Sequence, residues 1–102
     1  MARYRVAAVS DVPIDTVKGV IADGQEICLG HCEEGFYALD DVCTHENFLL
    51  SGGEMVEDCE VECPQHGSRF NLKTGKVTGL PAVIDARRFP VTVEGGDVYV
   101  DV

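Results

Sequence analysis

The sequence lacks long apolar runs and has few basic residues. No stretch approaches the roughly 18–20 apolar residues of a membrane-spanning helix. The N-terminus also shows no apolar signal-peptide core, so we expect a cytoplasmic protein. The 8 Lys and Arg residues are outnumbered by 18 Asp and Glu residues, which gives a net charge of −10. This charge disfavours nucleic acids and anionic membranes, and it suits either solubility or brief docking on basic protein surfaces.

Helical periodicity is absent as well, since apolar residues do not recur at a spacing of 3.6. Short segments of alternating apolar residues, separated by Gly-rich turns, instead predict an all-β fold, an antiparallel sandwich or barrel. The length of 102 residues predicts a single domain, 1–102. The strands that we expect are 4–9, 16–22, 25–31, 36–39, 54–57, 59–62, 68–72, 76–77, 87–94 and 97–101.

Two short clusters of cysteine and histidine stand out in this β pattern. They are Cys43-Thr44-His45 and Cys63-Pro64-Gln65-His66, and 17 residues separate them, Glu46 to Glu62. Two thiolates and two imidazoles presented in this way can hold one metal centre. Zinc sites of the Cys2His2 type usually place both cysteines in one turn and both histidines in the other. One of each per cluster instead fits a [2Fe–2S] centre with two Cys on one iron and two His on the other.

Three further cysteines lie outside these clusters, at Cys28, Cys32 and Cys59. An odd total of five cannot pair completely, and cytoplasmic proteins seldom contain disulfide frameworks. We therefore expect these three residues to be core or surface thiols. The remaining histidine, His31, is expected to be a satisfied strand residue without a functional role.

The segment Cys43–Asn71, CTHENFLLSGGEMVEDCEVECPQHGSRFN, resembles the cluster-binding region of Rieske proteins. Nearly the whole chain resembles the soluble Rieske-type ferredoxins of bacterial ring-hydroxylating, aromatic dioxygenase systems. The resemblance implies an antiparallel β base with a small cluster-binding subdomain inserted at about 42–76. It also implies one [2Fe–2S] cluster whose ligands are Cys43, His45, Cys63 and His66, with the histidines near the protein surface.

The resemblance extends to residues around the cluster. High-potential Rieske proteins clamp their two ligand loops with a disulfide, and the matching residues here, Phe48 and Gln65, cannot form one. Of two hydroxyl groups that bond to sulfur in those proteins, Ser68 is present, but Phe70 occupies the second position. We therefore predict a low-potential centre, near the bottom of the Rieske range of about −150 to +300 mV.

Several prolines and glycines are expected to shape the backbone near the cluster. Pro64, Gly67 and Gly52-Gly53 permit turns in which main-chain N–H groups approach sulfide closely. The segment Leu80-Pro81-Ala82 resembles the proline loop that shields the cluster in this family, although a generic turn explains Pro81 almost as well.

By this resemblance the chain carries single electrons from an NAD(P)H-dependent flavin reductase to a terminal Rieske non-haem iron oxygenase that hydroxylates aromatic compounds. We expect a monomeric carrier rather than an enzyme, because the sequence shows no G-x-G-x-x-G fingerprint and no domain large enough for a substrate cavity. Two alternatives are a housekeeping ferredoxin linked to iron–sulfur cluster assembly and a non-catalytic subunit similar to the small subunit of nitrite reductase. Neighbouring genes would distinguish them.

Overall fold

The computed structural model describes residues 2–44, 48–65 and 67–102, so the expected ligands His45 and His66 lie outside the described residues. The strands form three antiparallel sheets. The first sheet has the order β1 (Arg3–Ala8), β11 (Asp97–Asp101), β10 (Val91–Glu94). The second has the order β2 (Thr16–Ala22), β3 (Gln25–Cys32), β4 (Gly35–Asp40), β9 (Arg88–Phe89). The third has the order β5 (Glu54–Val56), β6 (Glu60–Glu62), β7 (Arg69–Asn71), β8 (Val77–Gly79).

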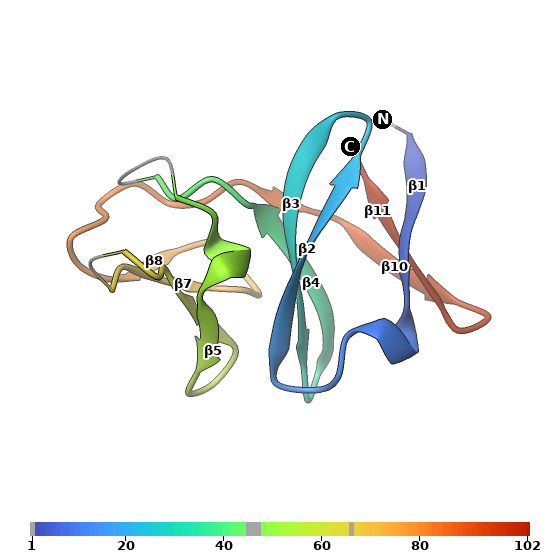
Figure 1. Ribbon diagram of the computed structural model, residues 1–102, viewed down its shortest axis with the longest axis horizontal. Helices are drawn as coiled ribbons and strands as arrows, with labels where there is room; N and C mark the ends of the chain where they lie inside the picture. Colours follow the sequence, from blue (N-terminus) through green and yellow to red (C-terminus); the bar gives the residue numbers. More distant parts are fainter. Residues whose placement is uncertain (1, 45–47, 66) are drawn as a thin grey trace.

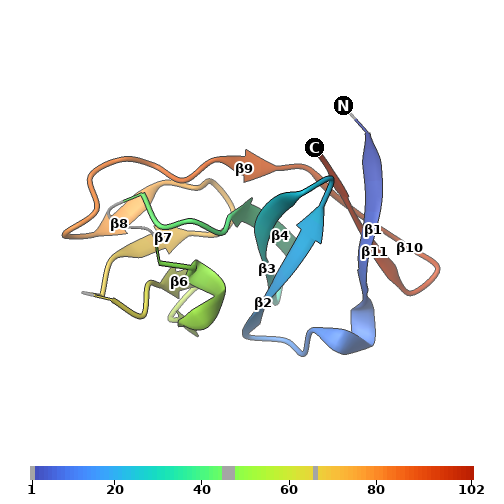
Figure 2. The same cartoon turned by 45° about the horizontal axis from the view of Figure 1, so that its top comes forward.

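The second sheet is the middle layer of the molecule. The first sheet packs on one side of it, and the third sheet lies on the other side, toward one end of the long axis (Figure 1). The same order of layers is visible after rotation (Figure 2). Helix is confined to two short 3-10 turns among the described residues, η1 (Val9–Asp11) and η2 (Leu50–Gly52). The predicted all-β fold is therefore confirmed, and the part of the chain that the structure describes contains no helix long and apolar enough to cross a membrane.

Strand β3 shows why the sequence forms this layered arrangement. Its consecutive residues Ile27, Cys28 and Leu29 are all fully buried. Because side chains alternate across a strand, Ile27 and Leu29 enter the core shared with the first sheet, whereas Cys28 enters the core shared with the third. A continuous apolar run is the expected pattern for a strand that is covered on both faces.

One predicted strand, 87–94, is wrong. The chain instead forms two strands, because Arg88–Phe89 pairs with β4 and Val91–Glu94 pairs with β11. Pro90 separates them, and proline has no N–H with which to continue a ladder of hydrogen bonds. The chain therefore crosses from the second sheet to the first at this residue.

The expectation that Cys32 and Cys59 are free thiols is also wrong. These residues form a disulfide with a Cα–Cα distance of 5.6 Å across 27 residues of sequence. The bond joins the end of β3 to the residue before β6, so it links the second sheet to the third. The prediction failed because their proximity depends on how two sheets pack. Cys28, by contrast, is a free, fully buried thiol, as expected.

His31 behaves as predicted for a satisfied strand histidine. Its Nδ1 lies 2.7 Å from the carbonyl oxygen of Val12. Its ring stacks on Phe36 with a centroid separation of 3.9 Å.

Candidate metal centre

The first ligand loop, residues 42–49, follows β4. Val42 and Leu49 form an isolated antiparallel bridge across it. The N–H of Cys43 donates a hydrogen bond of 2.8 Å to the carbonyl oxygen of Phe48. These contacts turn the Cys43 side chain inward, where the residue is 3% exposed, whereas Phe48 and Leu49 face solvent.

Asp41 closes the base of this loop, and the sequence interpretation missed it. Its carboxylate accepts hydrogen bonds from the N–H and the hydroxyl of Ser51, at 2.7 and 2.6 Å. Its carbonyl oxygen accepts a third from the N–H of Leu50 at 2.7 Å. The buried carboxylate is thus satisfied and holds both ends of the loop together. The sequence carried little signal, because an acidic pair such as Asp40-Asp41 at the end of a strand is usually exposed.

The second ligand loop, residues 63–68, is closed in a similar way. The N–H of Cys63 donates to the carbonyl oxygen of Ser68 at 2.7 Å. Gly67 has a φ of +75°, in the left-handed region that glycine adopts without steric cost. The loop buries the Cys63 residue to 2% exposure. The turn therefore depends on the glycine that the sequence analysis singled out.

The chain before β5 packs tightly against the chain that leads to Cys63. A Cβ atom on Gly53 would lie 1.9 Å from the carbonyl oxygen of Glu62 and 3.2 Å from Cδ of Pro64. A Cβ on the adjacent Gly52 would meet nothing closer than 3.7 Å. Of these two glycines, Gly53 is the one required by a close approach.

A third segment, residues 80–84, is hydrogen-bonded to both ligand loops. The N–H of Ala82 donates to Oγ of Ser68 at 3.1 Å, and both residues are buried. The hydroxyl of Thr44 donates to the carbonyl oxygen of Ile84 at 2.6 Å. Because Ser68 accepts this bond through a lone pair, its own O–H remains able to donate. The segment contains Pro81, preceded by a cis peptide bond, and it includes the residues for which the sequence analysis predicts a shielding proline loop.

The two cysteines of the motif suit a metal that prefers soft ligands. Cys43 and Cys63 are buried in one cluster of residues, and neither is part of the Cys32–Cys59 disulfide. Cys28 is the remaining cysteine outside the disulfide, and burial, with a smaller contribution from the nearby Asp41 carboxylate, raises its pKa far above the ordinary value. A protonated thiol is a poor metal ligand. Among the described residues, no group of three or more His, Cys, Asp or Glu side chains could hold a metal ion. The expected ligands His45 and His66 are not among these residues.

Layered antiparallel sheets with two loops that each bury one cysteine define a small all-β protein. The family of Rieske [2Fe-2S] domains matches residues 2–90, and the chain belongs to this family. This membership supports an iron–sulfur cluster as the cofactor rather than zinc.

Individual relatives agree with this membership. The chain is 40% identical over 107 aligned positions to the 3-phenylpropionate/cinnamic acid dioxygenase ferredoxin subunit of Escherichia coli, covering 99% of this chain and 94% of the relative. The solved ferredoxin of carbazole 1,9a-dioxygenase from Nocardioides aromaticivorans has a TM-score of 0.92 and 31% identity, covering 98% and 97% of the two chains.

A third relative was solved as a complex of reduced oxygenase and oxidised ferredoxin in carbazole 1,9a-dioxygenase. The matching chain has a TM-score of 0.88 and 34% identity, with 96% of this chain and 91% of that chain covered. Relatives named as ferredoxins of dioxygenase systems confirm the predicted role of an electron carrier rather than a catalytic enzyme.

Proposed function

We propose that Cys43, His45, Cys63 and His66 hold one [2Fe–2S] cluster, with both cysteines on one iron and both histidines on the other. The observation that carries this assignment is that the cysteine of each ligand loop, Cys43 and Cys63, is buried in one and the same cluster of residues. The cluster, when bound, takes up and releases one electron at a time. We further propose that the chain forms a single domain, 1–102, in which the segment from about residue 42 to about residue 76 is the cluster-binding subdomain.

The protein's own residues shield and orient this site. The Asp41–Ser51 hydrogen bonds hold the first loop closed, and the Cys63–Ser68 bond holds the second. Ser68 is fully buried and has an O–H to donate, which supports its proposed hydrogen bond to a cluster sulfur. The binding of Ala82 to the same hydroxyl oxygen supports a shielding role for Pro81 and its neighbours.

We infer that the physiological task is to carry electrons from an NAD(P)H-dependent flavin reductase to a terminal oxygenase that hydroxylates an aromatic compound. The relatives named above as ferredoxins of dioxygenase systems support this role. The proposed place of action is the cytoplasm, where NAD(P)H is available, and the proposed carrier is a monomer. A net charge of −10 favours brief, salt-sensitive encounters with basic partner surfaces.

An apolar surface beside the ligand loops is the proposed contact with the oxygenase. Leu80, Val83 and Ile84 are 77%, 75% and 63% exposed, although large apolar side chains are usually covered. Thr44 ties this segment to the first ligand loop through the carbonyl of Ile84. A partner seated on these three side chains would therefore lie next to the proposed cluster.

Replacing Val83 and Ile84 together by aspartate is expected to slow electron delivery about tenfold, the equivalent of about 1.4 kcal/mol of lost docking energy. The measurement is stopped-flow reduction of a purified aromatic-ring oxygenase that the wild-type protein supports. The matched control is the double variant Ile14→Asp/Val93→Asp, which also adds two charges at exposed apolar residues, outside the segment 80–84. Unchanged delivery by the Val83→Asp/Ile84→Asp variant would refute this docking surface.

The reduction potential tests the ligand assignment independently of any partner. Because Phe70 is fully buried and carries no hydroxyl, one hydrogen bond that stabilises the reduced centre in high-potential relatives is unavailable. We expect a Rieske-type EPR spectrum after dithionite reduction and a midpoint near −150 mV. A potential above about +100 mV would refute the low-potential assignment, and a colourless protein holding zinc would refute the cofactor.

A further inference from the structure

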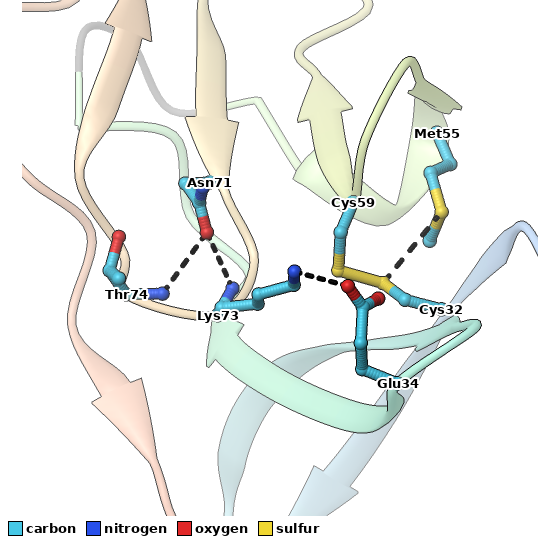
Figure 3. A network of polar contacts seen from close by, with 7 residues as sticks. All are labelled: Cys32, Glu34, Met55, Cys59, Asn71, Lys73 and Thr74. Atoms are coloured by element: carbon cyan, nitrogen blue, oxygen red, sulfur yellow. Dashed lines mark hydrogen bonds and ion pairs between the residues drawn. A yellow bond between two sulfur atoms is a disulfide. The ribbon is translucent and has the colours of Figure 1, made fainter.

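The disulfide between Cys32 and Cys59 lies beside a solvent-facing hollow on the surface. Figure 3 shows the bond in a network of polar contacts, with Met55 on one side and the Lys73–Glu34 ion pair nearby. Sδ of Met55 lies 4.0 Å from Sγ of Cys32. Both cysteines are nearly buried, at 2% and 4% exposure, yet both line the hollow. The hollow is therefore the side from which a small thiol would approach the disulfide.

The hollow is strongly acidic. Besides the two cysteines and Met55, its wall consists of carboxylate residues, namely Asp15, Glu33, Glu34, Glu57 and Asp58. Lys73 pairs with Glu34 and Arg69 with Glu57, so two of the five carboxylates are offset and three are not. A hollow lined by charges of one sign concentrates ions of the opposite sign and repels those of the same sign.

We propose that Cys32 and Cys59 form a reversible thiol–disulfide site that exchanges with small cationic aminothiols in preference to anionic thiols such as glutathione. This site is separate from the one-electron chemistry proposed for the ligand loops. Strand β6 connects the two sites, because Cys59 directly precedes this strand and Cys63 directly follows it.

The exchange is a two-electron reaction that balances with two thiol molecules. The thiolate of the first aminothiol attacks one sulfur of the Cys32–Cys59 bond, forms a mixed disulfide and releases the other cysteine, which takes up a proton. The thiolate of the second aminothiol attacks the mixed disulfide, releasing the remaining cysteine to take up a proton. The protein gains two electrons and two protons, and the two aminothiols leave as one oxidised disulfide. The reverse reaction, with that cationic disulfide as oxidant, restores the bond.

The preference follows from charge rather than from intrinsic reactivity. Cysteamine carries a positive charge on its ammonium group, whereas glutathione carries a net negative charge at neutral pH. At equal thiolate concentration the acidic wall attracts the first and repels the second. We expect cysteamine to reduce the pair about tenfold faster at low ionic strength, with a smaller ratio in high salt because screening weakens both effects.

The test uses the intact oxidised protein with its cofactor, under anaerobic conditions. Reduction by cysteamine or glutathione is followed by alkylation of the native protein and mass spectrometry of the peptides that contain Cys32 and Cys59. The variant Glu33→Gln/Asp58→Asn should lower the rate ratio. The control Asp23→Asn/Glu94→Gln removes the same charge from exposed residues away from the hollow and should leave the ratio unchanged.

Each contrary result overturns the proposal. Equal rates of reduction by cysteamine and glutathione would show that the acidic wall does not discriminate between cationic and anionic thiols. A disulfide that neither thiol reduces would have a structural role only. If reduced protein treated with cystamine, the disulfide of cysteamine, kept free thiols at Cys32 and Cys59, the disulfide would not re-form and the site would not be reversible. None of these readouts depends on electron transfer to an oxygenase.

Discussion

Replacing Cys63 by serine is expected to abolish cluster binding, so that iron and acid-labile sulfide in the purified protein fall to background. Thiolate is the soft, anionic ligand that an iron–sulfur centre requires, and a serine hydroxyl remains protonated at neutral pH. The loop would still close, because the bond between Cys63 and Ser68 uses main-chain atoms alone. Iron and sulfide analysis, together with the EPR spectrum of the reduced protein, measures the result.

Cys28→Ala provides the matched control for this experiment. Cys28 is likewise a buried cysteine of the same core and lies outside the disulfide, but its raised pKa disfavours the thiolate form. We expect this variant to retain the wild-type iron content and spectrum. A Cys63→Ser protein that keeps a full complement of iron and sulfide would contradict the ligand assignment. Loss of the cluster from a folded Cys28→Ala protein would contradict it as well.

Replacing Gly53 by alanine is expected to destabilise the protein by about 3 kcal/mol, the upper end of typical overpacking costs. The new Cβ would lie 1.9 Å from the carbonyl oxygen of Glu62, which is a main-chain atom and cannot rotate away. The chain from Glu62 to Pro64, which carries Cys63, must then move. We therefore expect a lower cluster content and an apparent thermal midpoint more than about 10 °C below that of the wild type.

Gly52→Ala isolates the effect of this close approach. Its Cβ would make ordinary contacts, with Cγ of Pro64 at 3.7 Å as the nearest atom, so stability and iron content should change little. Both variants are compared at one scan rate, because loss of the cluster can make unfolding irreversible. Similar behaviour of the two variants would show that the spacing between Gly53 and Glu62 does not control the second ligand loop.

The strands illustrate how far local patterns reach. The strand predicted at 16–22 is observed with the same limits, Thr16–Ala22, because alternating side chains and the following turn are both local signals. The single strand expected at 87–94 failed at Pro90, where the chain leaves one sheet for another. The first half, β9, pairs with Ala38 and Leu39 of β4, which lie more than 40 residues earlier in the sequence. No local sequence pattern can predict a partner at that distance.

The surroundings of the candidate site divide in the same way. Gly67 and Ser68 were recognised from their place after the second cluster of ligands, and both occupy constrained positions in the loop. Asp41 was not recognised, because a carboxylate is buried here only through its pairing with Ser51, ten residues later. This pairing exists because the fold brings the end of β4 next to the η2 turn, which contains Ser51.

Local signals along the chain were enough to predict the all-β class, the two clusters of cysteine and histidine and, through them, the family, because periodicity and motif spacing are properties of residues close in sequence. Tertiary structure alone decided that Cys32 bonds to Cys59, that Cys28 remains a protonated core thiol and that Asp41 closes a loop. Each of these outcomes depends on the stacking of sheets, which sets the distances and the burial that chemistry requires.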